Sequence, residues 1–138
     1  MEAFNFNKES IDSSIELQRV ISFVNELYGS YFTIREIHWN TYKMATHKLC
    51  DDVSEYLIDT TDSIMEAIMG SVEERPGFGI LNPNIPKTED LKMLLKVLKN
   101  KATLLKTWIS GDQFISVNNL LDDFIQKIAD YIYLSDNS

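Results

Sequence analysis

The sequence predicts an all-α protein, folded as a four-helix bundle with one long connection. Two observations lead to this fold class. The five glycines and three prolines of the 138 residues fall mostly in one segment, RPGFGILNPNIP. Elsewhere apolar residues recur at intervals of three and four, which is the period of an amphipathic helix. Four such stretches with one long linker are typical of a bundle, and we expect a single domain over residues 1–138.

Two helices are expected before the linker. The first is predicted over residues 11–39, where an apolar stripe leads up to a histidine. The members of this stripe are Leu17, Val20, Val24, Leu27, Tyr31, Ile34 and His38. The second helix is predicted over residues 46–70, with Thr46 as its N-cap and Gly70 as its C-cap.

The linker, residues 71–87, leads to two further helices. Thr88, followed by Glu89 and Asp90, is typical of a helix start and opens a third helix that runs to residue 108. The residues SGDQ then form a turn, and a fourth helix is predicted over residues 114–134. Its apolar stripe consists of Leu120, Leu121, Phe124, Ile128 and Ile132.

Charge and composition exclude several classes of function. The net charge is −8, so the surface repels phosphate backbones and we expect no nucleic-acid partner. No apolar run reaches the ~20 residues that a membrane helix needs, so we expect no membrane partner. The first residues lack the pattern of a signal peptide. Cys50 is the only cysteine and cannot form a disulfide within the chain, which suits a cytoplasmic location.

Both histidines and several acids gather around the second helix. On a helical wheel with His47 at zero, Asp51 falls at about 40°, Asp62 at about 60° and Glu66 at about 100°. These four residues share one stripe, on the side away from the main apolar face, and His38 lies nearby at the end of the first helix. Mixed imidazole and carboxylate ligands suit iron, manganese or zinc. The alternative is that the acids are solvated and His38 is a core histidine with satisfied hydrogen bonds.

The two ligand pairs on the second helix are too far apart to bind one metal within one chain. His47 and Asp62 are 15 residues apart, which is about 22 Å along a helix. Two copies of the helix, packed antiparallel across a two-fold axis, would bring His47 and Asp51 of one chain to Asp62 and Glu66 of the other. Three apolar residues on the same side would fill the seam of this homodimer: Ile58, Met65 and Met69.

The same stretch resembles a known family, the Dps-type mini-ferritins (DNA protection during starvation). The residues that carry the resemblance are His38-Trp39-Asn40, His47 with Asp51, Asp62 with Glu66, Tyr56 and Gly70. The resemblance implies a ferritin-like bundle with a long crossover connection. It also implies an iron site made by His38, His47 and Asp51 of one chain and Asp62 and Glu66 of its mate, within a two-fold homodimer or a twelve-subunit cage.

Three functions stay open from the sequence. The first is a ferroxidase-type oxidoreductase that oxidises Fe(II) with peroxide or oxygen and sequesters the iron. The second is a non-enzymatic structural or assembly protein on the same fold, with a vestigial or structural metal site. The third is a ferritin-like protein that carries zinc or manganese. Trp39 and Cys50 are interpreted as core residues rather than as functional ones.

Overall fold

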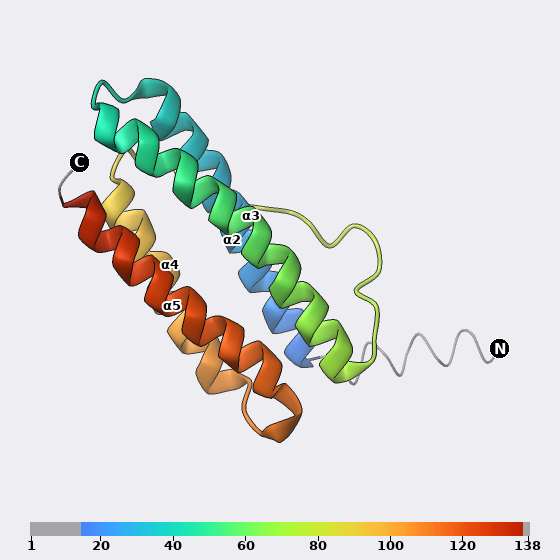
Figure 1. Ribbon diagram of the computed structural model, residues 1–138. Helices are drawn as coiled ribbons and strands as arrows, with labels where there is room; N and C mark the ends of the chain where they lie inside the picture. The colour runs from blue at the N-terminus through green and yellow to red at the C-terminus, as the bar shows by residue number, and fades with distance from the viewer. Residues whose placement is uncertain (1–14, 137–138) are drawn as a thin grey trace.

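Residues 15–136, the part of the chain that the computed structural model describes, form an all-helical bundle (Figure 1). The helices are α2 (Ile15–Asn40), α3 (Met44–Val72), α4 (Leu91–Trp108) and α5 (Ile115–Ser135), and a short 3-10 helix, η1 (Asp112–Phe114), precedes α5. These residues contain no strand. The expected all-α class is therefore confirmed for the described residues. The predicted start of the first helix, residues 11–14, lies outside them.

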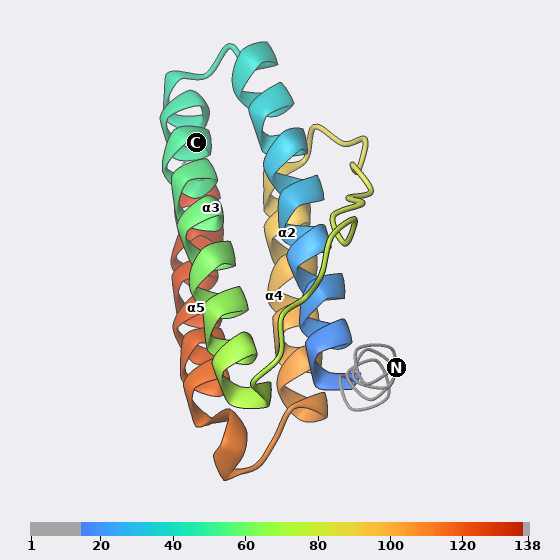
Figure 2. The same ribbon diagram turned by 90° about the vertical axis from the view of Figure 1, so that its right-hand side faces the viewer.

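The helices pair as two hairpins, α2 with α3 and α4 with α5. Figure 2 shows that α3 and α4 run in the same direction, so the linker between them has to return along the bundle. It does so along the outside of α2, where the side chain of Asn25 forms two hydrogen bonds to the linker backbone. The Asn25 side-chain amide donates to the Ile80 carbonyl at 2.9 Å, and its oxygen accepts from the Asn82 backbone N–H at 2.7 Å.

The ends of α3 differ from those expected. The helix begins at Met44, with Lys43 as N-cap, and the predicted cap Thr46 already lies in its first turn. The start moves because the His47 backbone N–H bonds to the Lys43 carbonyl at 3.0 Å. Gly70 does not end the helix either. The left-handed conformation that stops it is adopted by Glu73, at φ 56°.

The start of α4 follows the expected signal more closely. Asp90 is the N-cap, and its carboxylate accepts the Met93 backbone N–H at 3.0 Å. The Thr88 hydroxyl in turn accepts the Asp90 backbone N–H at 3.1 Å. Two side chains therefore fix the start of α4: Asp90 caps the helix, and Thr88 accepts the backbone N–H of Asp90.

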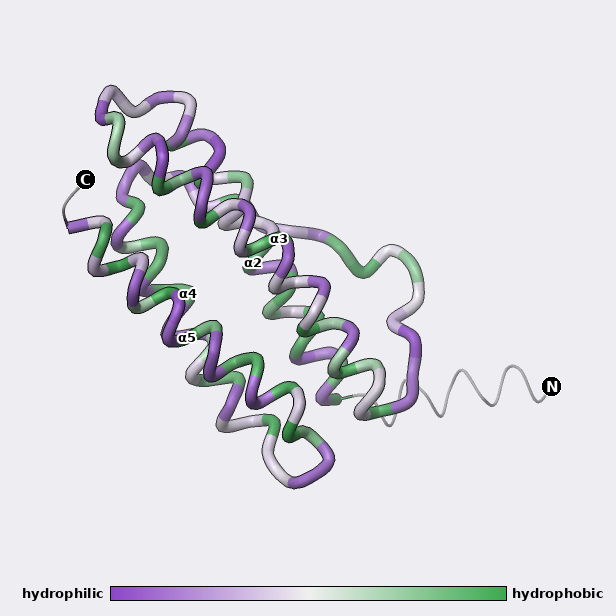
Figure 3. Tube along the Cα trace, in the orientation of Figure 1, coloured by the Kyte–Doolittle hydropathy of each residue, from purple (hydrophilic) through white to green (hydrophobic). Residues whose placement is uncertain are grey.

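The core runs through all four helices, and hydrophobic and hydrophilic residues alternate along each of them (Figure 3). Its largest fully buried members include Leu27, Ile34, Leu57 and Phe124. Cys50 is also buried, as expected. Trp39 is a correction: it is 69% exposed, because it follows His38 by one residue and so points away from the neighbouring helix. None of the described helices is long and apolar enough to cross a membrane.

Candidate metal centre

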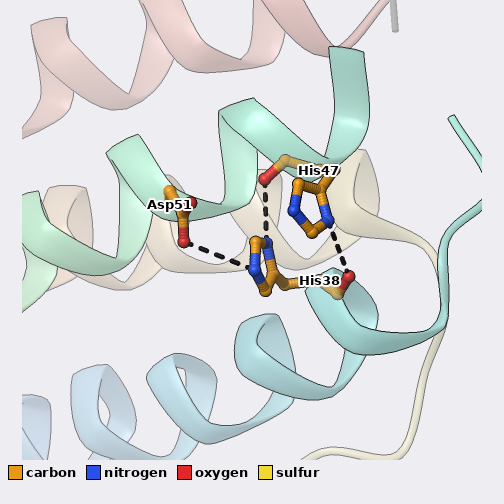
Figure 4. Close-up of side chains that lie close together, drawn as sticks. All are labelled: His38, His47 and Asp51. Carbon is orange, nitrogen blue, oxygen red and sulfur yellow. Dashed lines mark hydrogen bonds and ion pairs between the residues drawn. The ribbon is translucent and has the colours of Figure 1, made fainter. Parts of the chain in front are cut away.

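Three of the five predicted ligands meet at the end of the bundle where α2 turns into α3. His38 comes from the last turn of α2, and His47 and Asp51 come from the first two turns of α3 (Figure 4). One ligand atom from each of the three residues lies within 4.8 Å of the other two. His38 is buried, His47 is half-buried and Asp51 is exposed, so the cluster is open to solvent on one side.

The short connection between the helices creates this arrangement. Only residues 41–43 separate α2 from α3, so the last turn of one helix has to lie against the first turn of the other. Within α3, the four-residue spacing of His47 and Asp51 places both on the same side of the helix. The Thr41 hydroxyl accepts the Lys43 backbone N–H at 3.2 Å and stabilises the turn.

Hydrogen bonds fix both imidazole rings in a form that suits a metal. His38 Nδ1 lies 2.9 Å from the His47 carbonyl oxygen, and His47 Nδ1 lies 3.1 Å from the His38 carbonyl oxygen. A carbonyl oxygen only accepts hydrogen bonds, so each Nδ1 carries the hydrogen. In the neutral ring, Nε2 then keeps its lone pair and is the atom that can bind a metal. Metal-ligating histidines commonly donate their other N–H to a backbone carbonyl in this way.

The two rings also lie close to each other. Their centroids are 3.7 Å apart and their planes differ by 22°, so they are stacked. This contact, together with the reciprocal hydrogen bonds, ties the end of α2 to the start of α3. The same interactions that position the ligands therefore also hold the turn between the helices.

Asp51 has a second partner, Arg35 of α2. Arg35 donates to Asp51 Oδ1 at 2.9 Å and to the Ser54 hydroxyl at 3.3 Å. The hydrogen bond from Arg35 is the main cause that holds the pKa of Asp51 below its usual value, and the nearby His38 contributes in the same direction. The carboxylate is therefore the charged form that a cation needs, but its Oδ1 is shared with a guanidinium.

The spacing of the ligand atoms is near that of a metal site without matching it fully. His38 Nε2 and Asp51 Oδ1 are 3.6 Å apart, and two ligand atoms on one tetrahedral metal are about 3.4 Å apart. No two of the three ligand atoms are more than 4.8 Å apart. For comparison, two ligand atoms on opposite sides of one ion are about 4.2 Å apart.

The other two predicted ligands do not join the cluster in the single chain. Asp62 and Glu66 are exposed on α3, toward its other end. Asp62 lines a pocket of about 380 Å³ between α2, α3 and the linker, and Met65 lines the same pocket. Met65 also packs against the core of its own chain. Part of the face that was expected to be a dimer seam is thus bordered by the chain's own linker.

Arg35 and Ser54 were missed from the sequence. Arg35 lies three residues before His38 and Ser54 three residues after Asp51, so the helical period placed both on the sides that face this site. The signal was therefore present. A positive charge is not a metal ligand, however, and a search for ligand types alone does not find it.

Comparisons of the chain with family models, with curated proteins and with solved structures returned no match. The resemblance of residues 38–70 to the mini-ferritins thus remains a prediction from the sequence.

Proposed function

We propose that this protein binds a divalent transition metal at His38, His47 and Asp51, and that iron is the metal it uses. The observation that carries the proposal is the convergence of the three ligand atoms within 4.8 Å, with each Nδ1 facing a carbonyl. Two imidazoles and one carboxylate leave coordination positions open, which is the condition for redox chemistry at iron rather than for a closed structural site.

The proposed activity is that of a mini-ferritin-like ferroxidase. In it, Asp62 and Glu66 of a second chain complete the site across a two-fold axis. Hard carboxylate oxygens favour Fe(III) over Fe(II), and so they ease the loss of an electron. Two Fe(II) ions would reduce one hydrogen peroxide, with two protons, to two water molecules, and the Fe(III) formed would be sequestered. The return of the linker along α2 supports the ferritin-like connection of the bundle that this proposal assumes (Figure 2).

One observation favours a second candidate, a helical structural or assembly protein whose site holds no catalytic metal. Asp51 is already paired with Arg35 at 2.9 Å, and both histidines already have backbone partners. The side chains of the cluster are therefore stabilised by groups of their own chain. In this candidate, the cluster serves to hold the turn between α2 and α3.

Complementation between two inactive variants tests the shared site. His47→Ala and Glu66→Ala should each abolish iron oxidation in a homodimer, because every site needs both chains. Refolded together at equal amounts, the two variants form heterodimers with one intact and one doubly altered site. Oxidation should then return to up to about half the wild-type rate per heterodimer if the sites act independently.

Controls separate the two candidate functions. Asp130→Ala, at an exposed acid on α5, should leave the oxidation rate unchanged. If activity does not return although subunit exchange is proven by mass spectrometry, the ligands do not meet across a two-fold axis. If Fe(II) binding is the same in wild type, His47→Ala and Glu66→Ala, the structural candidate replaces the enzymatic one.

A further inference from the structure

A second surface of the molecule, on the outer side of α4, carries an unexplained apolar stripe. Met93, Val97, Leu104 and Trp108 are 56%, 41%, 46% and 47% exposed. At 100° per residue these four side chains fall within about 60° of one another on the helix. The buried residues of α4, such as Leu98, lie on the other side. The stripe is therefore a continuous apolar line about 22 Å long on a helix surface.

The spacing of the stripe is symmetric about its centre. Met93 lies seven positions before Asn100, and Trp108 lies seven positions after Lys101. Val97 lies three positions before Asn100, and Leu104 three positions after Lys101. Two such stripes laid antiparallel would therefore oppose a large residue to a large one at both ends, and a branched residue to a branched one between them.

We propose that a second copy of this chain packs its α4 antiparallel against this stripe, across a two-fold axis that passes between Asn100 and Lys101. An isologous interface requires a patch that complements itself, and the spacing of the stripe supplies this. Met93 of one copy then contacts Trp108 of the other, and Val97 contacts Leu104. This surface is separate from the metal ligands and is independent of the proposed function.

The area of the surface is sufficient for a dimer. The four side chains of the stripe and the neighbouring Ile15, which is 49% exposed, offer roughly 500 Å² per copy, or about 1,000 Å² for the pair, which is the lower limit for a specific interface. Arg19 lies over the Trp108 ring at 4.9 Å and donates to the Trp108 carbonyl. Trp108 is thus already held in place before the copies meet, which lowers the entropy lost on association.

Charge is the main objection to this pairing, because α4 contains five lysines and no acid. Three of these lysines are already paired with acids of their own chain. The pairs are Lys92 with Asp136, Lys101 with Glu26, and Lys106 with Asp122. The positive charge that faces a second copy is accordingly reduced, and the remaining repulsion should weaken as salt is added.

The same basic and apolar surface fits one other occupant, an anionic lipid surface. Two features favour the second copy. The palindromic spacing has no role at a membrane, and the overall charge of −8 opposes approach to anionic lipid. Binding to vesicles is therefore an outcome that the test has to include.

A matched pair of variants tests the surface. Leu104→Glu places a charge in the proposed seam, whereas Thr103→Glu places the same charge one residue away, outside the stripe. Both positions are exposed, so the fold should tolerate both changes. In metal-free protein, sedimentation velocity should show dimer association weakened by Leu104→Glu, with the dissociation constant raised at least tenfold, and little changed by Thr103→Glu. Equal effects of the two variants overturn the proposal.

Cross-linking tests the antiparallel geometry and distinguishes this dimer from one made through α3. In a Cys50→Ala background, a short bismaleimide should link Asn100→Cys to its own copy, because the two residues lie on either side of the axis. Met93→Cys should not be linked, because the two copies of residue 93 are about 22 Å apart. Linking of both variants means a parallel or unspecific contact, and linking of neither means that the α4 surfaces do not meet. Wild-type protein that stays monomeric but sediments with vesicles of phosphatidylserine and phosphatidylcholine assigns the stripe to lipid instead.

Discussion

Asp51 is the residue on which metal binding and the metal-free fold compete. Its Oδ1 accepts a hydrogen bond from Arg35 at 2.9 Å and lies 3.6 Å from His38 Nε2. A cation that binds between the imidazoles has to share this oxygen with the guanidinium of Arg35. Otherwise the cation has to displace the guanidinium toward Ser54, to which Arg35 also donates. The arginine is also a positive charge next to a cation site. Both effects lower the affinity for metal.

Removal of Arg35 should therefore strengthen metal binding. We expect Arg35→Met to bind Fe(II) or Zn(II) roughly tenfold more tightly than wild type, since a nearby like charge is lost and Asp51 is released. The metal affinity of Arg35→Lys should lie between those of wild type and Arg35→Met. Lys48→Met removes an exposed charge beside His47, and it should raise the metal affinity less than Arg35→Met does. Isothermal titration calorimetry measures the metal affinity of the wild type and the three variants. Weaker binding in Arg35→Met would show that Arg35 orients Asp51 rather than competing for it.

Cys50 gives the fold a dependence on alkaline pH. Burial raises the pKa of its thiol from 9.0 to about 11, with Arg35 lowering it and Asp51 raising it to smaller extents. The unfolded chain thus releases this proton at lower pH than the folded chain does. The contribution to stability is complete below pH 9 and is lost as the pH rises from about 9 to about 11.

Replacing the thiol should remove this dependence. We expect the free energy of unfolding of Cys50→Ala to fall less between pH 8.5 and pH 10.5 than that of wild type, whatever the cost of the substitution at pH 8.5. Urea denaturation at the two pH values measures the difference. Parallel losses in the two proteins would mean that other groups, such as the buried Tyr131, cause the alkaline destabilisation.

At the scale of elements, Gly29 sets how closely the linker approaches α2. A Cβ at this position would lie 2.1 Å from the Asn84 carbonyl oxygen, which is backbone and cannot rotate away. We expect Gly29→Ala to displace the linker and lower the free energy of unfolding by roughly 1–3 kcal/mol, despite the better helix propensity of alanine.

Gly70 provides the matched control, because it is also in a helix and a Cβ there meets nothing within 4 Å. Gly70→Ala should stabilise the protein by about 0.5–1 kcal/mol. Chemical denaturation measures the free energy of unfolding of both variants. It shows whether the clash with the linker or the helix propensity of alanine determines the effect at each position. Stabilisation by Gly29→Ala would mean that the linker does not lie against α2 in solution.

The helices themselves were predictable, and the ends that were missed are those of α3. Apolar periodicity located all four, because each helix buries one stripe against the others. The end signals of α3 were misleading, because Thr46 and Gly70 have the residue types of caps but the hydrogen bonds form at Lys43 and Glu73. Which residue stops a helix depends on where its neighbours lie, and this information is not local.

At the scale of the whole molecule, the candidate site was predictable in part. His38, His47 and Asp51 come together as expected, because helical spacing and a short turn determine their positions. Arg35 was not foreseen, because no ligand pattern contains it. Asp62 and Glu66 cannot be placed by one chain, since their proposed partners belong to a second copy. The structure of one chain can therefore test only the half of the proposed site that one chain contributes.

The linker between α3 and α4 also offers a site at which a protease can cut the chain into two fragments. Phe78 is fully exposed between Gly77 and Gly79, both with positive φ, in the one long connection of the described chain. Chymotrypsin should cut after Phe78 first, and more readily than at Tyr42, which is equally exposed but lies in a turn too tight for a protease cleft. Native mass spectrometry should find the two fragments still associated, because Asn25 binds the linker on the far side of the cut. Fragments that separate under native conditions would contradict this.

Every residue of the proposed iron site lies before that cut. The first fragment would carry both histidines and all three carboxylates, and the second would carry the α4 stripe and the rest of the core. A nicked protein should therefore keep its metal affinity for as long as its halves stay together. Halves from different variants could then be recombined by unfolding and refolding two nicked proteins together, so that changes at the metal site and changes on α4 are combined without making a new double variant.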